Sequence, residues 1–349
     1  MKKIYVLLFL LFCNHATAYY FPFVFNSTRP MGMGNAFTAA ADDVNSLEYN
    51  PAGLAYVEGQ NVSFDGNWME YDYRYYGVFE QALVANYTYG GGKISYARKN
   101  IGISVDYRLE GDIKNKTAVD IYDYNQHHWT VVYRSDLSKL LQVSAGYGLE
   151  IDRFAFGLNL KAVYFENESL DVGGANNRFV YSFDLGCIYR FSGNFSAGLV
   201  LLRKGLNTLT VNYPLQGAGI TTYTQFYSLN AGLMYTPAEG TKLAFDIRNI
   251  LPMGTHFGMI PEAWYTFPVT FHFGIEQALP DNFVLRAGLM EYWRDDDYSG
   301  EITFRTEATA GFGIKTRGFV WDIALADDFQ TVYNVKYPVQ ILASFGYNF

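Results

Sequence analysis

Residues whose types could support chemistry are few, and their spacing favours none of the usual reactions. Asp295, Asp296 and Asp297 offer three carboxylates to a divalent cation, but a run of solvated charges is the simpler interpretation. His127 and His128 are adjacent, so in a strand they face opposite sides and cannot share a metal ion. We therefore predict no metal site.

The remaining candidates have simple structural interpretations. His272 and Glu276 lie two steps apart on one face of a predicted strand, where a polar interior contact is more plausible than an acid–base pair. Cys187 has no neighbour at metal-ligand spacing, so it is interpreted as a packed thiol. In residues 32–37 Phe37 replaces the third glycine of a dinucleotide fingerprint. Without a nucleophile elbow, zinc motif or phosphate loop, the chain is predicted to be no enzyme and to use no cofactor.

The N-terminus predicts export. Lys2 and Lys3 precede an apolar run over residues 4–12, and Ala16-Thr17-Ala18 forms a cleavage site, so residues 1–18 are predicted to be a signal peptide. A lipoprotein signal at Cys13 is the alternative, but bulky Phe12 fits it poorly. Removing the two lysines leaves 24 basic and 34 acidic residues, a net charge of -10. That charge argues against nucleic-acid binding.

Composition narrows the fold class. Aromatic residues make up 18% of the chain, with 30 Tyr and 28 Phe, and charged residues only 17%. Such rings suit long strands that carry aromatic girdles where hydrocarbon meets water. No apolar stretch of helix-spanning length follows the signal. An exported chain of this kind is either a soluble β-protein or an outer-membrane barrel.

Strand length and loop rhythm favour the barrel. Many candidate strands run 10 to 15 residues, for example Phe154 to Tyr164, and suit a tilted membrane crossing. After residue 150, short connections at 192–194, 236–240, 279–281 and 315–317 alternate with long ones, which is the outer-membrane plan. We therefore predict an all-β fold, a transmembrane antiparallel β-barrel.

The number of strands is less certain from sequence. Five candidates precede residue 150, at 61–72, 75–89, 93–110, 119–134 and 139–150, with Gly90-Gly91-Gly92 interpreted as a turn, and ten follow. Fifteen is an odd number, whereas bacterial single-chain barrels have even numbers. We predict fourteen strands, with sixteen as the alternative. The C-terminal Phe345, Tyr347 and Phe349 share one face and resemble the signature by which the barrel assembly machinery recognises its substrates.

Residues 29–54 do not alternate. They are small and Gly/Ala-rich, and we expect a short helix over residues 35–41 and a second helical turn capped by Asn45 or Ser46 and ended by Pro51 and Gly53. Helical turns cannot join a membrane-facing sheet. This segment should therefore lie inside the barrel or at its periplasmic mouth.

The same segment carries a family resemblance. Gly-Met-Gly-Asn-Ala-Phe-Thr-Ala-Ala-Ala-Asp-Asp (32–43) followed by Asn-Pro-Ala-Gly-Leu (50–54) resembles the N-terminal signature of the FadL-like outer-membrane proteins, including their PorV-type branch. The resemblance implies an N-terminal hatch over residues 19–58 that plugs an approximately 14-stranded barrel over residues 59–349. It also implies a set of hatch or gating residues: Gly32, Gly34, Asn35, Ala36, Asp42, Asp43, Asn50, Pro51, Ala52 and Gly53.

By this resemblance the chain is an integral outer-membrane protein of a diderm bacterium, in contact with outer-membrane lipid. It would take up hydrophobic small molecules, such as long-chain fatty acids, passively past the hatch and sideways through a gap between strands. A long loop rich in Met and aromatics is a plausible capture surface, with Phe257, Met259, Ile260, Trp264 and Tyr265.

Two alternatives to transport stay open. PorV-type relatives act as partners or scaffolds of secretion-system components, and the two motifs do not separate the branches. A general porin is the other alternative. An apolar lumen site would favour transport, a stable protein contacting the long loops would favour a partner role, and a wide polar channel would favour a porin.

Overall fold

The structure is a computed structural model, and it describes residues 18–19, 27–76, 82–111, 117–123, 128–134, 137–167, 178–203, 206–207, 209–212, 219–257, 269–295, 302–328 and 340–349. Several sequence predictions lie outside these ranges. They concern the signal segment through residue 17, His127, Asp296, Asp297, and the loop residues Met259, Ile260, Trp264 and Tyr265. Phe257 is the last residue of a strand.

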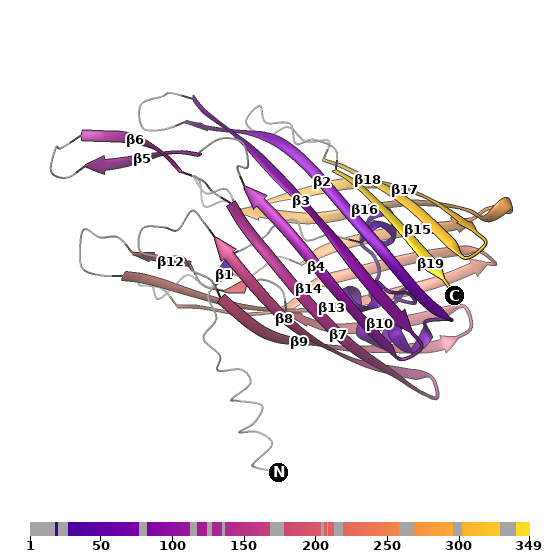
Figure 1. Cartoon of the computed structure of the whole chain (residues 1–349). Helices are drawn as coiled ribbons and strands as arrows, with labels where there is room; N and C mark the ends of the chain where they lie inside the picture. Colours follow the sequence, from indigo (N-terminus) through magenta and orange to yellow (C-terminus); the bar gives the residue numbers. More distant parts are fainter. Residues whose placement is uncertain are drawn as a thin grey trace, which may run out of the picture.

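Within the described part of the chain, fourteen antiparallel strands form a closed ring (Figure 1). Neighbours in sequence are neighbours in the ring, and pairing of the last strand with the first and of β10 with β13 completes it. The strands are β2 (Gln60–Tyr76), β3 (Ala82–Arg98), β4 (Ile101–Gly111), β7 (Leu137–Ile151), β8 (Phe154–Asn167), β9 (Arg178–Ser192), β10 (Phe195–Arg203), β13 (Gly219–Ala238), β14 (Thr241–Phe257), β15 (Thr270–Ala278), β16 (Phe283–Asp295), β17 (Ile302–Thr316), β18 (Phe319–Asp328) and β19 (Gln340–Asn348). The predicted fold class is confirmed.

The remaining strands lie outside this ring. β5 (Thr117–Asp123) and β6 (His128–Arg134) pair with each other as a separate hairpin, β1 (Ala18–Tyr19) pairs with β11 (Leu206–Asn207), and β12 (Leu209–Asn212) adds to β13. The predicted single strand at 119–134 is therefore wrong, and it is the extra one in the count of fifteen. Both arms of the hairpin are rich in residues that favour strands, so alternation alone does not locate the reversal.

The prediction of a turn at Gly90-Gly91-Gly92 is also wrong, because all three lie within β3. Gly90 is paired with Trp68, and the indole ring lies across the space that a side chain at Gly90 would occupy. Gly91 faces the interior, where an added Cβ would lie 2.5 Å from the carbonyl oxygen of Tyr107. Gly90 and Gly91 therefore serve close approach within the sheet and not a chain reversal.

The two faces of the wall have opposite character. On β15 the inward side chains His272 and Glu276 are buried, whereas Phe271 and Phe273 point outward and are 40% and 50% exposed. The outward face of the other strands is likewise apolar, and the lumen holds most of the buried charge. This inversion of the soluble pattern suits a wall that faces hydrocarbon. No helix among the described residues is long and apolar enough to cross a membrane.

One rim of the barrel is formed by short connections. β3–β4, β7–β8, β9–β10, β13–β14 and β17–β18 are joined by two residues each, and β15–β16 by four that include the 3-10 turn η2 (Pro280–Asn282). The four short connections predicted after residue 150 are among them. The C-terminus lies at the same end of the barrel (Figure 1). We call this end the short-turn rim.

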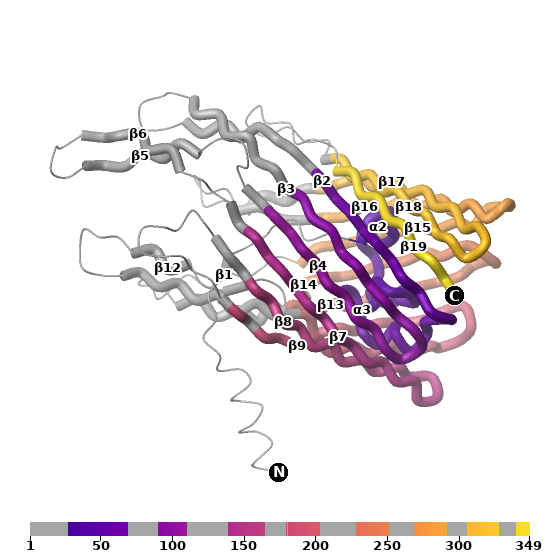
Figure 2. The backbone as a smooth tube through the Cα atoms, viewed as in Figure 1, coloured from indigo at the N-terminus to yellow at the C-terminus, as the bar shows by residue number. Residues whose placement is uncertain are grey.

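Short helical elements lie inside the ring towards the short-turn rim (Figure 2). They are α2 (Thr28–Gly32), α3 (Ser46–Tyr49) and the 3-10 helix η1 (Pro51–Tyr56). The predicted turn after Asn45 is α3, but Pro51 and Gly53 do not end it, because both lie in η1, and residues 35–41 form no helix. Gly34 and Asn35 adopt left-handed backbone angles that end α2, and the N–H groups of Phe37 and Thr38 bond to the wall instead of to a preceding turn.

The interior position of Gly91 generates a stability prediction. Gly91→Val places a side chain against the backbone of β4, and we expect a destabilisation of about 1–3 kcal/mol. Gly92→Val is the matched control, because the neighbouring glycine faces outward and its added Cβ meets nothing closer than 3.6 Å. Heat-modified gel migration should show a lower unfolding temperature for Gly91→Val only. Equal temperatures for the two variants would contradict this account of β3.

Candidate functional site

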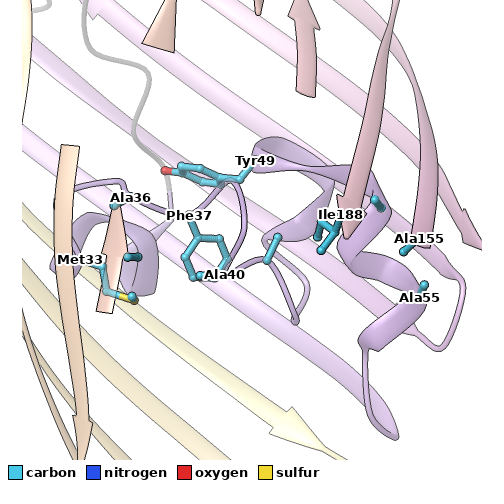
Figure 3. Packing of buried hydrophobic residues seen from close by; sticks show 11 residues of the cluster. Met33, Ala36, Phe37, Ala40, Tyr49, Ala55, Ala155 and Ile188 are labelled. Carbon is cyan, nitrogen blue, oxygen red and sulfur yellow. The ribbon is translucent and has the colours of Figure 1, made fainter. Parts of the chain in front are cut away.

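The candidate site is the segment at residues 27–57, the described part of the predicted hatch, together with the wall that it covers. Nearly all of its side chains are buried, and its apolar centre joins Met33, Ala36, Phe37 and Tyr49 to wall residues such as Ile188 (Figure 3). Phe37 and Tyr49 meet edge to face, with ring centroids 5.5 Å apart. The segment is thus packed as a core and not loosely held in the lumen.

Glycines of the wall let the hatch backbone lie directly on the sheet. Gly157 and Gly186 are cross-strand partners on β8 and β9, and a Cβ on Gly157 would lie 2.5 Å from the carbonyl oxygen of Pro51. A track of such glycines crosses nine strands: Gly102, Gly146, Gly148, Gly157, Gly186, Gly198, Gly232, Gly274, Gly288 and Gly311. Sequence reasoning missed this track, although a glycine at the middle of successive strands was a visible signal.

The predicted hatch glycines form the other side of these contacts. Gly34 has a φ of 60°, and an added Cβ would lie 2.6 Å from the carbonyl oxygen of Leu289. Its N–H donates to Thr309 Oγ1 at 3.0 Å, and its carbonyl oxygen lies 2.8 Å from His272 Nδ1. Gly32 lies on Gly311 of the wall, and Gly53 lies against residue 41 within the hatch. His272 therefore contacts the hatch, as a polar interior residue.

The two predicted asparagines are fully buried and hold the hatch together. Asn50 caps η1 by accepting from Ala52 N at 3.1 Å, and its amide donates to the carbonyl oxygens of Thr38 and Cys187 at 2.8 and 3.2 Å. Pro51 and Ala52 follow in η1 and are buried against the wall glycines.

Asn35 lies at the other end of the hatch. It accepts a 2.6 Å hydrogen bond from the Tyr49 hydroxyl, and its backbone carbonyl accepts one from Arg248. Ala36 packs beside it in the apolar centre. Burial raises the pKa of Tyr49, so the hydroxyl stays protonated and available as a donor.

Asp42 and Asp43 belong to an ion-pair network centred on Arg29. The guanidinium group of Arg29 lies 2.6 Å from Asp42, 2.8 Å from Asp43, and pairs with both carboxylate oxygens of Glu276 at 2.8 Å. Lys242 lies 2.7 Å from Asp42, and Arg286 lies 2.7 Å from Glu276. The network joins the hatch to β14, β15 and β16. Sequence reasoning identified the two aspartates but neither Arg29 nor the partners on the wall.

A second polar anchor was missed altogether. Asp246 of β14 accepts from the backbone N–H groups of Phe37 and Thr38 at 2.9 and 3.0 Å and from the Thr38 hydroxyl at 2.7 Å. On the opposite wall the buried Lys93 of β3 reaches Ser27 at 2.6 Å and Glu48 at 3.4 Å. A lone Asp or Lys in an alternating strand gave no signal of such a partner.

The network fixes the charges of the hatch. Burial opposes the positive charge of Arg29, but Asp42, Glu276 and Asp43 outweigh it and hold its pKa well above the ordinary value. Burial alone would raise the pKa of Asp42, yet Arg29 and Lys242 reverse this and hold it well below its usual range. Glu48 follows the same pattern, because Lys93 and Arg108 overcome the effect of burial and lower its pKa. These groups stay ionised and paired at neutral pH.

The arrangement of the site supports closure of the lumen. Among the described residues no group of three or more His, Cys, Asp or Glu side chains is arranged to hold a metal ion. The C-terminal aromatics lie elsewhere, on the outer face, where Phe345 stacks with Phe319 at 5.6 Å and Tyr347 meets Phe349 edge to face. What the arrangement can do is block the lumen with a segment held by contacts that are individually breakable.

The glycine track generates a test of that closure. Gly157→Val forces a side chain into the backbone of η1, and we expect the hatch to lift and small polar solutes to leak several-fold faster in liposome swelling. Gly66→Val is the control, since its added Cβ faces outward and meets nothing closer than 4.0 Å. If both variants leaked at the rate of the parent chain, the hatch would not seal the lumen.

The lowered carboxyl pKa values predict how closure depends on pH. The contributions of Asp42 and Glu48 are fully present above the ordinary pKa of about 4 and are lost as pH falls through the lowered values. Leakage should stay constant from about pH 8 to about pH 5 and rise only below about pH 4. Asp42→Asn should leak already at neutral pH, whereas Asp281→Asn in the β15–β16 connection should match the parent. A leak that opened between pH 8 and 6 would contradict control by Asp42 and Glu48.

Comparisons with known proteins bear on the fold. No protein-family model matches the chain, and no curated protein sequence matches it. The toluene transporter TbuX of Ralstonia pickettii is 14% identical, with a TM-score of 0.61 over 93% of this chain and 98% of its own. The toluene transporter TodX of Pseudomonas putida is 15% identical, with a TM-score of 0.58 over 92% and 97%.

A FadL homologue of Pseudomonas aeruginosa is 11% identical, with a TM-score of 0.62 over 95% of this chain and all of its own. Identities this low establish a shared fold and no more. The aligned part of this chain spans the barrel in all three comparisons. The chain therefore has the FadL-like outer-membrane fold that residues 32–43 and 50–54 predicted.

Proposed function

We propose that this chain is an integral outer-membrane channel through which hydrophobic small molecules enter passively, with the hatch as its gate. The observation that carries the proposal is the seated hatch, because it blocks the lumen through Arg29, Asp246, Lys93 and the glycine track. A general porin needs an open polar lumen, and this arrangement is opposite to it. The similar folds of the toluene transporters TbuX and TodX support the class of cargo.

The proposal assigns a role to each part of the chain. Residues 1–18 serve as the export signal, residues 19–58 as the hatch, and residues 59–349 as the barrel in a diderm outer membrane. The outward apolar wall supports that location, because strands can bury such a face only in lipid or against another protein. The outward aromatics Phe345, Tyr347 and Phe349 serve as the signal for barrel assembly. No step of passive transfer requires a cofactor or catalysis, since apolar surface is exchanged for an apolar environment.

Uptake by cells tests the proposal. A diderm host that lacks such a channel should take up radiolabelled toluene several-fold faster when it makes this chain, while uptake of a polar solute of similar mass stays at background. Oleate in place of toluene tests whether long-chain fatty acids are also cargo. Gly66→Val should behave as the parent chain.

Other outcomes favour the alternatives. Equal acceleration of the polar and apolar probes would indicate a porin. No acceleration of either, together with a stable protein bound to the purified barrel, would indicate a PorV-type role with secretion-system components. Toluene and oleate uptake that both stay at the level of the host alone would refute the proposal.

A further inference from the structure

One apolar area of the wall is covered by a single side chain of the hatch. Met31 of α2 is fully buried against Met290 of β16, Ala324 and Ala326 of β18, and Leu342 of β19. Ala324 and Leu342 are directly paired across the two strands. α2 itself packs along β16 to β19. We call the four wall residues the Met31 recess.

We propose that the Met31 side chain occupies a binding site for the apolar end of the cargo, and that cargo enters this site by displacing it. This inference rests on the proposed function and names the place on the hatch at which an arriving molecule acts. The ligand class is a small aromatic ring or an unbranched alkyl end, because either can take the space of a methionine side chain.

The composition of the contact carries the argument. At a second apolar contact near the wall, Val44, Leu47, Leu54 and Val57 of the hatch surround the single wall residue Ala97, and in the apolar centre hatch residues likewise outnumber wall residues. At the Met31 recess the proportion is reversed, with one hatch residue among four from the wall. Removing one side chain therefore exposes an apolar surface that belongs to the rigid barrel. The barrel keeps that surface in place while the hatch moves.

At the polar anchors of the hatch an apolar molecule cannot compete. Arg29, Lys93 and Asp246 hold the hatch through ion pairs and hydrogen bonds, and no apolar molecule can replace those contacts. A ligand shifts an equilibrium only by the difference in its interactions with the two states. At the Met31 recess both occupants are apolar, so ligand contacts substitute for those of Met31 at little cost.

The residue types fit an exchangeable occupant. Methionine is unbranched and flexible, and its sulfur makes favourable contacts with aromatic rings. Ala324 and Ala326 have short side chains, so they leave space for occupants of different widths. Met290 can adjust to a ligand of a different shape in the same way. Such a surface can bind cargo molecules of different shapes.

Displacement of Met31 would change the contacts of Asn35, which links the recess to the rest of the hatch. The Asn35 amide lies 3.1 Å from the sulfur of Met290 and 3.7 Å from that of Met31, and its oxygen accepts the hydrogen bond of Tyr49. Asn35 therefore touches both the recess and the apolar centre of the hatch. Loss of Met31 from the recess removes one of these contacts and loosens the link to Tyr49.

Methionine-methyl NMR of the full chain in detergent tests the proposal, with toluene as the probe. Toluene should shift the methyl resonances of Met31 and Met290 saturably by its ring current. Met33, also fully buried but against Gly274 and Gly288, is the internal control and should not shift. Met31→Ala removes the competing occupant and should raise toluene affinity several-fold, whereas Leu289→Ala on the outward face of β16 should leave it unchanged.

A second pair of variants guards against misfolding of Met31→Ala. Ala326→Leu fills the recess and should lower toluene affinity several-fold, while Ala310→Leu on the outward face of β17 should not. Saturable binding that leaves Met31 and Met290 unshifted and is insensitive to Met31→Ala and Ala326→Leu would overturn the inference and leave the proposed function standing. Absence of saturable binding by the parent chain, combined with no gain in cellular uptake, would overturn both.

Discussion

The constraint on which this structure depends is that, in hydrocarbon, every backbone N–H and C=O group must find its hydrogen-bond partner within the protein. A closed ring of strands meets this requirement, because β19 pairs with β2 and β10 with β13, so no edge within the ring is left open to lipid. Closure also fixes the alternation of side chains: apolar residues such as Phe273 face out, and charged residues such as Glu276 face in. The lumen is therefore lined by polar and charged side chains, and a segment that fills it must pair with those charges.

The hatch meets them by carrying the complementary groups in an irregular chain. A helix of useful length would satisfy its own N–H groups and could not lie flat on the wall. Residues 35–41 instead leave N–H groups for Asp246, and Arg29 supplies the charge that Glu276 requires. Buried ion pairs of this kind contribute little net stability, but breaking one partner is costly. They therefore specify where the hatch sits more than how firmly the barrel folds.

The sequence predicted the parts whose physics is local. Strand alternation, the short connections and the non-alternating segment at 29–54 each follow from the residues in one window, and so does the helical turn after Asn45. Glu276, the wall partner of Arg29, lies 247 positions away, so no window contains that pair. The predicted turn at Gly90-Gly91-Gly92 was wrong for the same reason. A run of glycines is a local turn signal, but here Gly90 and Gly91 allow close approach of Trp68 and Tyr107 from neighbouring strands. The glycine track needed the register of nine strands before its purpose could be recognised.

Under the proposed function, closure against water and passage of apolar cargo place opposite demands on one segment, and the hatch separates them in space. Its ion pairs with β14, β15 and β3 centre on Arg29 and Lys93, and an apolar molecule cannot replace either group at its carboxylates. Its contact with β16, β18 and β19 passes through Met31, whose interactions any apolar group of similar size can reproduce. Selectivity then needs no pore of defined width. It follows from which contacts of the hatch an arriving molecule is chemically able to replace.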